Sequence, residues 1–222
     1  MAEPIRPSLD SQRFDVAVIG GGINGVAIAR ECARAGKRTL LLEQNDFSSG
    51  TTSRSTRIIH GGLRYLEHGE LGLVAESLRE RRRLLRTRPH LVRPRQFLLA
   101  LPQDGDRSAL AIRAGLWAYR LLGGSHSAPA GDGTLRELSQ YLDAGRRLHL
   151  FPYEDAQCEF PERLVAEWLA EACDAGSVAR NHAEVLQIEV RNGNACRLVF
   201  RDQLDASEQY IEANHFVNAT GP

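Results

Sequence analysis

The chain has 222 residues, enough for one large domain or for one and a half smaller ones. Its hydrophobic share of 42% and charged share of 25% are typical of a soluble globular protein. Lys+Arg and Asp+Glu both number 28, so no global charge excess indicates a nucleic-acid-binding protein or an acidic tail. No apolar run is long enough to span a bilayer, and the polar segment 1–13 lacks the apolar region of a signal peptide. We therefore expect a cytoplasmic protein with a loose leader over residues 1–13.

The cysteines give no sign of a metal or redox centre. They form no Cys-x-x-Cys pair, and none has metal-ligand spacing to a histidine. We expect no metal, and we expect reduced cysteines that act as small apolar residues. The four positions are Cys32, Cys158, Cys173 and Cys196.

A βαβ unit opens the chain. The apolar run 14–19 is long enough for a buried strand and too short for a buried helix. Gly20-Gly21-Gly22 follows, and then an Ala- and Ile-rich helix is predicted over 23–35, with Gly36 as its stop signal. The run 39–43 is the next buried strand, and it should lie parallel to the first with a right-handed crossover.

Further loops, helices and strands are predicted after the βαβ unit. Residues 46–56 are rich in Ser, Thr and Gly and predict a functional loop. Apolar residues on one face of the helix predicted at 71–88 are Leu71, Val74, Ala75, Leu78 and Leu85, with Glu76–Arg79 and Glu80–Arg83 as exposed pairs. Further predicted elements are a strand at 95–101, a helix at 106–122, a loop at 125–133, a helix at 161–175 and strands at 184–190, 195–201 and 209–217.

The glycine turn satisfies the G-x-G-x-x-G pattern, which is weak alone and strong between a buried strand and a helix. Gly20 allows the tight turn, Gly22 lets a pyrophosphate approach the backbone, and Gly25 lets the helix pack close to the strand. The helix N-terminus offers free N–H groups and a positive dipole end to the phosphate. Glu43, at the tip of the second strand, can accept both hydroxyls of an adenosine ribose and disfavours a 2′-phosphate. The alternative is a glycine turn without a ligand.

The segment 50–67 distinguishes FAD from NAD. Its hydroxyl-rich first part can donate hydrogen bonds to a diphosphate from the side opposite the glycine turn. The Gly61-Gly62 pair lets backbone approach a flat ring. A polar surface loop is the alternative interpretation, but two arginines, a histidine and a double glycine in one stretch fit it poorly.

The stretch Ser-Arg-Ser-Thr-Arg-Ile-Ile-His-Gly-Gly-Leu-Arg-Tyr-Leu-Glu at 53–67 resembles the signature of FAD-dependent glycerol-3-phosphate dehydrogenases. Val-Ile-Gly-Gly-Gly-Ile-Asn-Gly at 18–25 is similar to the same family. The other matching stretches are Arg-Pro-His-Leu at 88–91, Ala-Gly-Leu-Trp-Ala-Tyr at 114–119 and Asn-Ala-Thr-Gly-Pro at 218–222. The resemblance runs from about Phe14 to the last residue, and 53–67 is its specific part.

The resemblance implies an α/β fold with a Rossmann-like FAD-binding domain of the glutathione-reductase type, interrupted by part of an α+β substrate domain. On this basis residues 14–94 form the first part of the FAD-binding domain. Residues 95–158 belong to the inserted substrate domain, and residues 159–222 return to the FAD-binding domain.

The resemblance also implies roles for individual residues. The ADP half of FAD would be held by Gly20, Gly22, Asn24, Gly25 and Glu43. The diphosphate would be lined by Thr52, Ser53 and Ser55, and the isoalloxazine edge by His60, Gly61, Gly62 and Leu63. The backbone of Val185 would meet the adenine, and Arg64 and Tyr65 would face the substrate. No catalytic residue is identified, because the general base is expected in a segment that the chain lacks.

The expected reaction is oxidation of the C2 alcohol of sn-glycerol 3-phosphate to dihydroxyacetone phosphate, with hydride transfer to the flavin. The chain departs from the family in carrying Phe-Pro-Glu-Arg-Leu at 160–164 and in being shorter than its members. We therefore expect residues 1–222 alone to be inactive. The alternatives are an FAD enzyme of the amine and amino-acid oxidase type, which the segments 214–217 and 219–221 also suit, and an inactive truncated fragment.

A local run of arginines suggests a contact with the inner face of the membrane. Enzymes of the family pass electrons to quinone or oxygen, and anionic lipid attracts each surface cation by roughly 1 kcal/mol. The alternative is a solvated helix face paired with Glu76 and Glu80. The run consists of Arg79, Arg81, Arg82, Arg83, Arg86, Arg88, Arg93 and Arg95.

Overall fold

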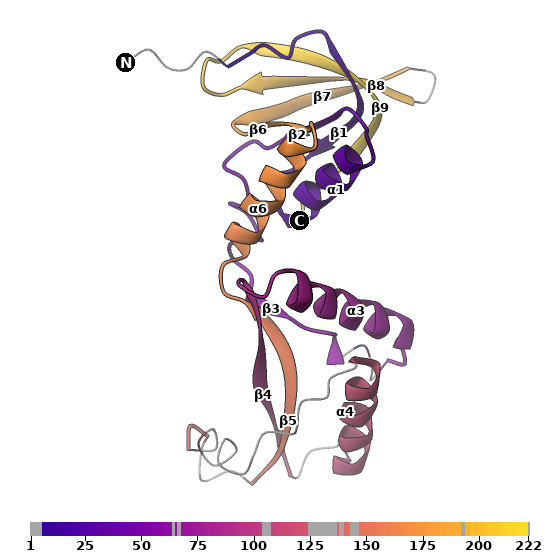
Figure 1. Ribbon diagram of the computed structural model, residues 1–222, viewed down its shortest axis with the longest axis vertical. Coiled ribbons are helices and arrows are strands. Elements are labelled where there is room, and N and C mark those ends of the chain that lie inside the picture. Colours follow the sequence, from indigo (N-terminus) through magenta and orange to yellow (C-terminus); the bar gives the residue numbers. More distant parts are fainter. Residues whose placement is uncertain are drawn as a thin grey trace. The chain divides into compact units, whose positions relative to one another are not determined.

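The chain divides into two compact units in a computed structural model (Figure 1). Unit 1 comprises Met1–Ser55 and Phe160–Pro222, and unit 2 comprises Thr56–Glu159. These packing boundaries differ from the division at 94/95 and 158/159 expected from the sequence, because the helix after residue 70 packs within unit 2. Which segments serve the cofactor and which the substrate stays a prediction. The structure describes residues 6–63, 65, 68–103, 108–123, 137, 140–142, 147–191 and 194–221.

In its described residues, unit 1 is built on a six-stranded sheet with the order β6-β2-β1-β9-β8-β7. Strands β6, β2, β1 and β9 run parallel to one another. Strands β9, β8 and β7 form an antiparallel meander. The strands are β1 (Gln12–Ile19), β2 (Thr39–Leu42), β6 (Val178–Arg180), β7 (Ala183–Arg191), β8 (Asn194–Asp202) and β9 (Glu208–Asn218). The predicted α/β class is confirmed.

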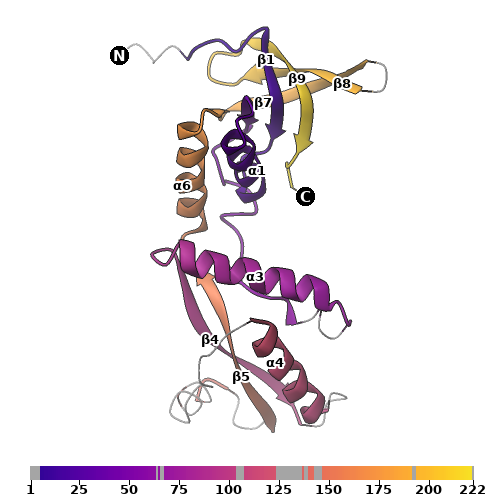
Figure 2. The same cartoon turned by 45° about the vertical axis from the view of Figure 1, so that its right-hand side comes forward.

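Two helices cover one face of this sheet, α1 (Ile23–Arg34) and α6 (Pro161–Asp174). The two helices lie side by side (Figure 2), and both contribute to one buried cluster with residues of β1 and β2. Val26 of α1 and Val165 of α6 join Leu41 of β2 in one buried cluster. On the other face, Leu40 and Leu42 pack with buried residues of β8 and β9. Strand β2 is therefore buried on both faces, as expected for a continuous apolar run in a parallel strand.

Unit 2 has, in its described residues, a three-stranded antiparallel sheet with the order β3-β5-β4. Helices α3 and α4 pack together through Val74, Leu78 and Tyr119. The elements are β3 (Ile58–Ile59), α3 (Leu71–Thr87), β4 (Val92–Pro102), α4 (Ala109–Gly123) and β5 (Leu148–Cys158).

Strand β5 was not predicted. Its sequence contains Pro152 and two adjacent acidic residues, Glu154 and Asp155, which obscure the strand pattern. The strand forms because β4 pairs with it along its whole length, from Val92 opposite Cys158 to Pro102 opposite Leu148. The short strand β6 was also not predicted, and the loop expected at 125–133 lies outside the described residues.

The face of α3 differs from the expected one. Val74 and Leu78 are buried, as expected, but Leu71 is 54% exposed and Arg81 is buried. Arg81 points inward because Asp155 of β5 lies within 2.6 Å of its guanidinium.

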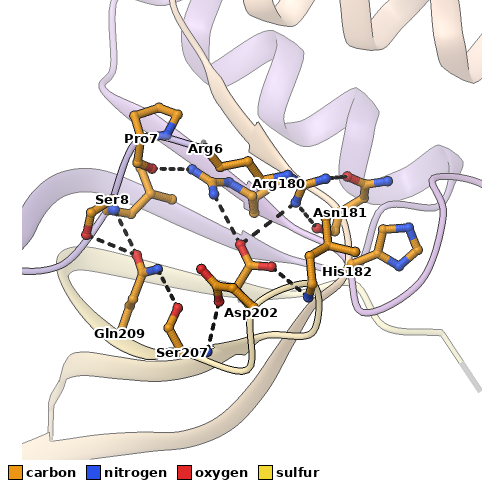
Figure 3. A network of polar contacts seen from close by, with 12 residues as sticks. Arg6, Pro7, Ser8, Arg180, Asn181, His182, Asp202, Ser207 and Gln209 are labelled. Atoms are coloured by element: carbon orange, nitrogen blue, oxygen red, sulfur yellow. Dashed lines mark hydrogen bonds and ion pairs between the residues drawn. The ribbon is translucent and has the colours of Figure 1, made fainter. Parts of the chain in front are cut away.

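Residues 6–13 are not the loose leader that the sequence suggests; residues 1–5 lie outside the described part. Leu9 is 3% exposed and belongs to the core cluster of unit 1. Its N–H donates to the side chain of Gln209 at 2.8 Å, and the carbonyl of Pro7 accepts a hydrogen bond from Arg180 at 2.7 Å. Figure 3 shows Arg180 between Pro7 and the carboxylate of Asp202, which it contacts at 3.2 Å. The segment is held in place because Arg180, which is paired with Asp202, also donates a hydrogen bond to the carbonyl of Pro7.

We expect Arg180→Ala to lower the free energy of unfolding by up to about 3–5 kcal/mol, because the buried Asp202 carboxylate loses its nearer cation and keeps the more exposed Arg6, at 3.9 Å. Arg201→Ala is the control, since Arg201 forms an exposed pair with Glu208 and should cost at most about 1 kcal/mol. Urea unfolding followed by Trp168 fluorescence measures both variants in unit 1. Equal losses in the two variants would contradict the assigned role of Arg180.

Candidate functional site

The carboxyl ends of three parallel strands meet at the glycine turn of unit 1. The N–H of Ala219, just after β9, donates to the carbonyl of Ile19 at the end of β1 at 2.8 Å. The N–H of Gly20 donates to the carbonyl of Leu42 at the end of β2 at 2.8 Å. Strand order reverses at β1, because β2 lies on one side and β9 on the other. Such a switch point is where open α/β sheets bind ligands.

The backbone of the turn requires glycine at two positions. Gly20 has φ +108°, which a residue with a side chain rarely adopts, and a Cβ there would overlap the carbonyl of Ala219. A Cβ on Gly25 would overlap the carbonyl oxygen of Gly20. The first turn of α1 can therefore approach the end of β1 only with glycine at position 25.

The N-terminus of α1 has the features of an anion site. Gly22 is the N-cap residue and provides no capping side chain, and the first turn has no acidic residue. One acceptor comes from the loop after β2, since the Oγ1 atom of Thr52 accepts a hydrogen bond from the N–H of Ile23 at 3.1 Å. The positive end of the helix dipole is therefore not neutralised by a carboxylate from its own first turn.

Glu43 is fixed by backbone groups at the end of β2. One carboxylate oxygen accepts from the N–H of Gly21 at 2.6 Å, and the other accepts from the N–H of Asn45 at 2.8 Å. Each carboxylate oxygen has about two acceptor positions, so each retains one for a further donor. The side chain is therefore held in place with capacity for two hydroxyl groups.

The hydroxyl-rich loop divides into two parts. Thr52 is 9% exposed and lies against the glycine turn, as does Ser48, which is 6% exposed and donates its N–H to the carbonyl of Gly21 at 2.9 Å. The hydroxyl of Ser53 donates to carbonyls of its own loop, as does that of Ser55. Ser48 was not among the predicted site residues, and its only signal is its place in the same Ser- and Thr-rich stretch.

The other predicted site residues do not belong to the glycine turn or to the loop after β2. Val185 is in β7, opposite Phe200 of β8, and packs against the core of unit 1. In unit 2, His60, Gly61, Gly62 and Leu63 follow β3. Leu63 packs against the α3–α4 cluster, and Tyr65 is 38% exposed. Arg64 lies outside the described residues.

The arginine run has one buried member, and two of its exposed members form ion pairs. Arg81 is buried, Arg83 pairs with Glu80, and Arg95 pairs with Glu159.

Among the described residues, no helix is long and apolar enough to cross a membrane. The same residues contain no cluster of three or more His, Cys, Asp or Glu that could hold a metal ion.

Residues 15–222 match the family model for FAD dependent oxidoreductases. The chain belongs to this family, and FAD is the cofactor of its members. It is 39% identical to a glycerol-3-phosphate dehydrogenase of Synechocystis, over 97% of this chain and 40% of that protein. It is 37% identical to a D-erythritol 1-phosphate dehydrogenase of Brucella abortus, over 100% of this chain and 43% of that protein. The chain thus spans about two fifths of the length of these relatives.

Solved structures give the same fold. The structure of a glycerol-3-phosphate dehydrogenase from Bacillus halodurans complexed with FAD matches with a TM-score of 0.70 and 27% identity, over 96% of this chain and 35% of that chain. An L-proline dehydrogenase from P. horikoshii matches with a TM-score of 0.70 and 18% identity, over 95% of this chain and 54% of that chain. The second similarity shows the fold alone.

We expect Gly25→Ala to destabilise unit 1 by about 1–3 kcal/mol, because the added methyl group must push α1 away from the end of β1. Gly115→Ala in α4 is the matched control, since a Cβ there meets nothing within 4 Å. The control should be neutral or stabilising by up to about 1 kcal/mol, because alanine favours helix over glycine. Urea unfolding followed by circular dichroism compares the two, and a Gly25→Ala protein as stable as the wild type would refute the close approach.

Proposed function

We propose that the chain binds FAD and is the flavin-binding part of an enzyme that oxidises sn-glycerol 3-phosphate to dihydroxyacetone phosphate. The observation that carries the proposal is the glycine turn at the strand switch point, with a helix end whose N-cap residue, Gly22, has no side chain, beside an immobilised Glu43 carboxylate. The similarity to glycerol-3-phosphate dehydrogenases over nearly the whole chain supports the substrate. We propose the activity for a protein of the relatives' length.

The proposed roles follow the chemistry of each group. The α1 N-terminus attracts the diphosphate, and the free acceptor positions of Glu43 receive the two ribose hydroxyls. When bound, FAD would supply the hydride acceptor, and the protein supplies position and field. Residues proposed to hold the ADP half are Gly20, Gly22, Asn24, Gly25, Glu43 and, at the adenine, Val185. Those proposed for the diphosphate are Thr52, Ser53 and Ser55, and those for the flavin edge are His60, Gly61, Gly62 and Leu63.

The substrate proposal rests on Arg64 and Tyr65. A guanidinium at position 64 would oppose the charge of the substrate phosphate, and Tyr65, which is 38% exposed, would pack or hydrogen-bond beside it. A second candidate is another polyol phosphate, since one relative is a D-erythritol 1-phosphate dehydrogenase. An amine or amino-acid oxidase reaction is supported only by similarity of fold.

The electron acceptor is proposed to be quinone or oxygen. Peripheral contact with an anionic membrane is a further proposal, and its support is the exposed part of the arginine run, which consists of Arg79, Arg82, Arg83, Arg86, Arg93 and Arg95. A solvated helix face explains the arginines of α3, and the Arg83–Glu80 pair favours that explanation, whereas Arg93 and Arg95 lie in β4.

We expect Glu43→Ala to weaken FAD binding by about 1.5–3 kcal/mol, because charge-assisted hydrogen bonds to the ribose are lost. Glu212→Ala, which removes an exposed carboxylate of β9 paired with Arg13, should leave FAD affinity unchanged. Titration of the apoprotein with FAD, followed by flavin fluorescence, measures both variants. Unchanged affinity in Glu43→Ala would remove this residue from the site, and absence of flavin binding in the wild type would overturn the proposed function.

We expect Arg64→Ala, in the protein of the relatives' length, to raise the KM for glycerol 3-phosphate roughly 10- to 100-fold, because a charged hydrogen bond to phosphate is lost. The KM for unphosphorylated glycerol should change far less. Steady-state assays with an artificial electron acceptor test this, and equal effects on both substrates would mean that Arg64 does not contact the phosphate. In the same assay we expect residues 1–222 alone to give no turnover.

A further inference from the structure

Tyr119 of α4 is buried, with 2% of its surface exposed, and its hydroxyl lies between two partners. The phenol oxygen accepts a hydrogen bond from the backbone N–H of Gly61 at 2.6 Å. The hydroxyl is 2.7 Å from the Oδ1 atom of Asp155. Because an amide N–H can only donate, the phenol proton must point to Asp155. The direction of both hydrogen bonds is therefore fixed.

Asp155, the partner of the Tyr119 hydroxyl, forms a buried ion pair with Arg81. The guanidinium of Arg81 contacts the same Oδ1 atom of Asp155 at 2.6 Å and donates to the carbonyl of Glu154 at 2.8 Å. It also lies over the ring of Tyr119, 5.8 Å from its centroid. Arg81 and Asp155 are each 2% exposed. Removing either partner would leave an isolated buried charge, so the arrangement has few alternatives.

The phenol of Tyr119 keeps its proton. Burial raises the pKa of Tyr119, and the negative charge of Asp155 raises it further, so the phenol remains neutral and keeps its donor proton. The pKa of Asp155 is also raised, because burial outweighs the hydrogen bond from Tyr119 and the charge of Arg81, which lower it.

Gly61 has a structural explanation in this arrangement. A Cβ on Gly61 would overlap the side chain of Leu78 and would lie 2.6 Å from the hydroxyl of Tyr119. The N–H of Gly61 is donated into the interior of unit 2. The sequence suggested that both glycines make room for a flat ring, whereas the packing alone requires glycine at position 61.

We infer that Tyr119 is a positioning residue: it anchors the turn His60–Leu63 through the N–H of Gly61, while Asp155 and Arg81 orient its hydroxyl. The inference rests on the proposed function, in which this turn lines the flavin edge. Tyr119 itself need not touch flavin or substrate. Its loss should therefore alter the environment of the flavin and the rate of its reduction more than the affinity for substrate.

The test compares Tyr119→Phe with Tyr153→Phe in the FAD-loaded protein of the relatives' length. Tyr153 stacks on Phe97 in the same unit and takes no part in the Gly61 contact, so it is a matched control. Hydrogen–deuterium exchange of the peptide containing residues 60–63 reports the anchor. Flavin absorbance, kcat and KM report the consequence for the site.

We expect exchange at Gly61 to be roughly tenfold faster in Tyr119→Phe, because its N–H loses a buried acceptor. The flavin absorbance maximum should shift and kcat should fall severalfold, with KM little changed, and Tyr153→Phe should change none of these. If Tyr119→Phe does not fold, Arg81→Lys tests the same groups from the other end: it keeps the Tyr119 hydroxyl but disturbs Asp155, which orients it, and should give smaller changes in the same directions.

Unchanged exchange would overturn the anchor. Faster exchange with unchanged absorbance and kcat would overturn the positioning role, because the contact would then be structural only. A wild-type protein without flavin absorbance would instead count against the proposed function, and the exchange rate, which needs no flavin, would still decide the anchor.

Discussion

The α-carbon of Gly25 lies against the carbonyl oxygen of Gly20, and a methyl group on Gly25 would overlap that oxygen. This close approach determines where α1 begins relative to β1. The N–H groups of the helix end consequently lie beside the carboxyl ends of β1, β2 and β9, which hydrogen bonds of Gly20 and Ala219 hold together. Glu43 and Thr52 are then placed by their bonds to this same turn. The candidate site of unit 1 thus depends on one contact between two backbone segments.

Each unit also contains a buried arginine–aspartate pair that holds a segment distant in sequence. In unit 1, Arg180 and Asp202 hold the segment around Pro7. In unit 2, Arg81 and Asp155 orient Tyr119, which holds Gly61. Burying two charges costs much of what their attraction gains, so such pairs contribute little net stability compared with apolar packing. Their effect here is to specify one arrangement of the segments that they contact.

Glycines at two turns of the chain serve different physical purposes. At the β1–α1 turn, glycine permits a backbone angle and a backbone approach that leave the helix end open to an anion. At Gly61, glycine permits the packing of Leu78 and Tyr119 and directs the N–H inward. A glycine motif can therefore accompany a ligand site in two ways, by lining it or by fixing the turn that lines it. For unit 1 we propose the first, because the family uses FAD, and for unit 2 the hydrogen bond to Tyr119 supports the second as a proposal.

Local pattern determined the βαβ unit, the glycine turn and the position of Glu43 at the end of β2, because a short apolar strand, a glycine stop and a helical period are all properties of neighbouring residues. The stretch 53–67 likewise indicated the family from adjacent residues. Only the tertiary structure decided that Arg81 lies inside, that residues 6–13 are held, and that 148–158 is a strand. Each of these depends on a partner far along the chain: Asp155 for Arg81, Arg180 for Pro7, and β4 for β5. An arginine on a helix and an aspartate in an irregular stretch both look exposed until the fold brings them together, because burial of a charge is favourable only when its partner is already in place.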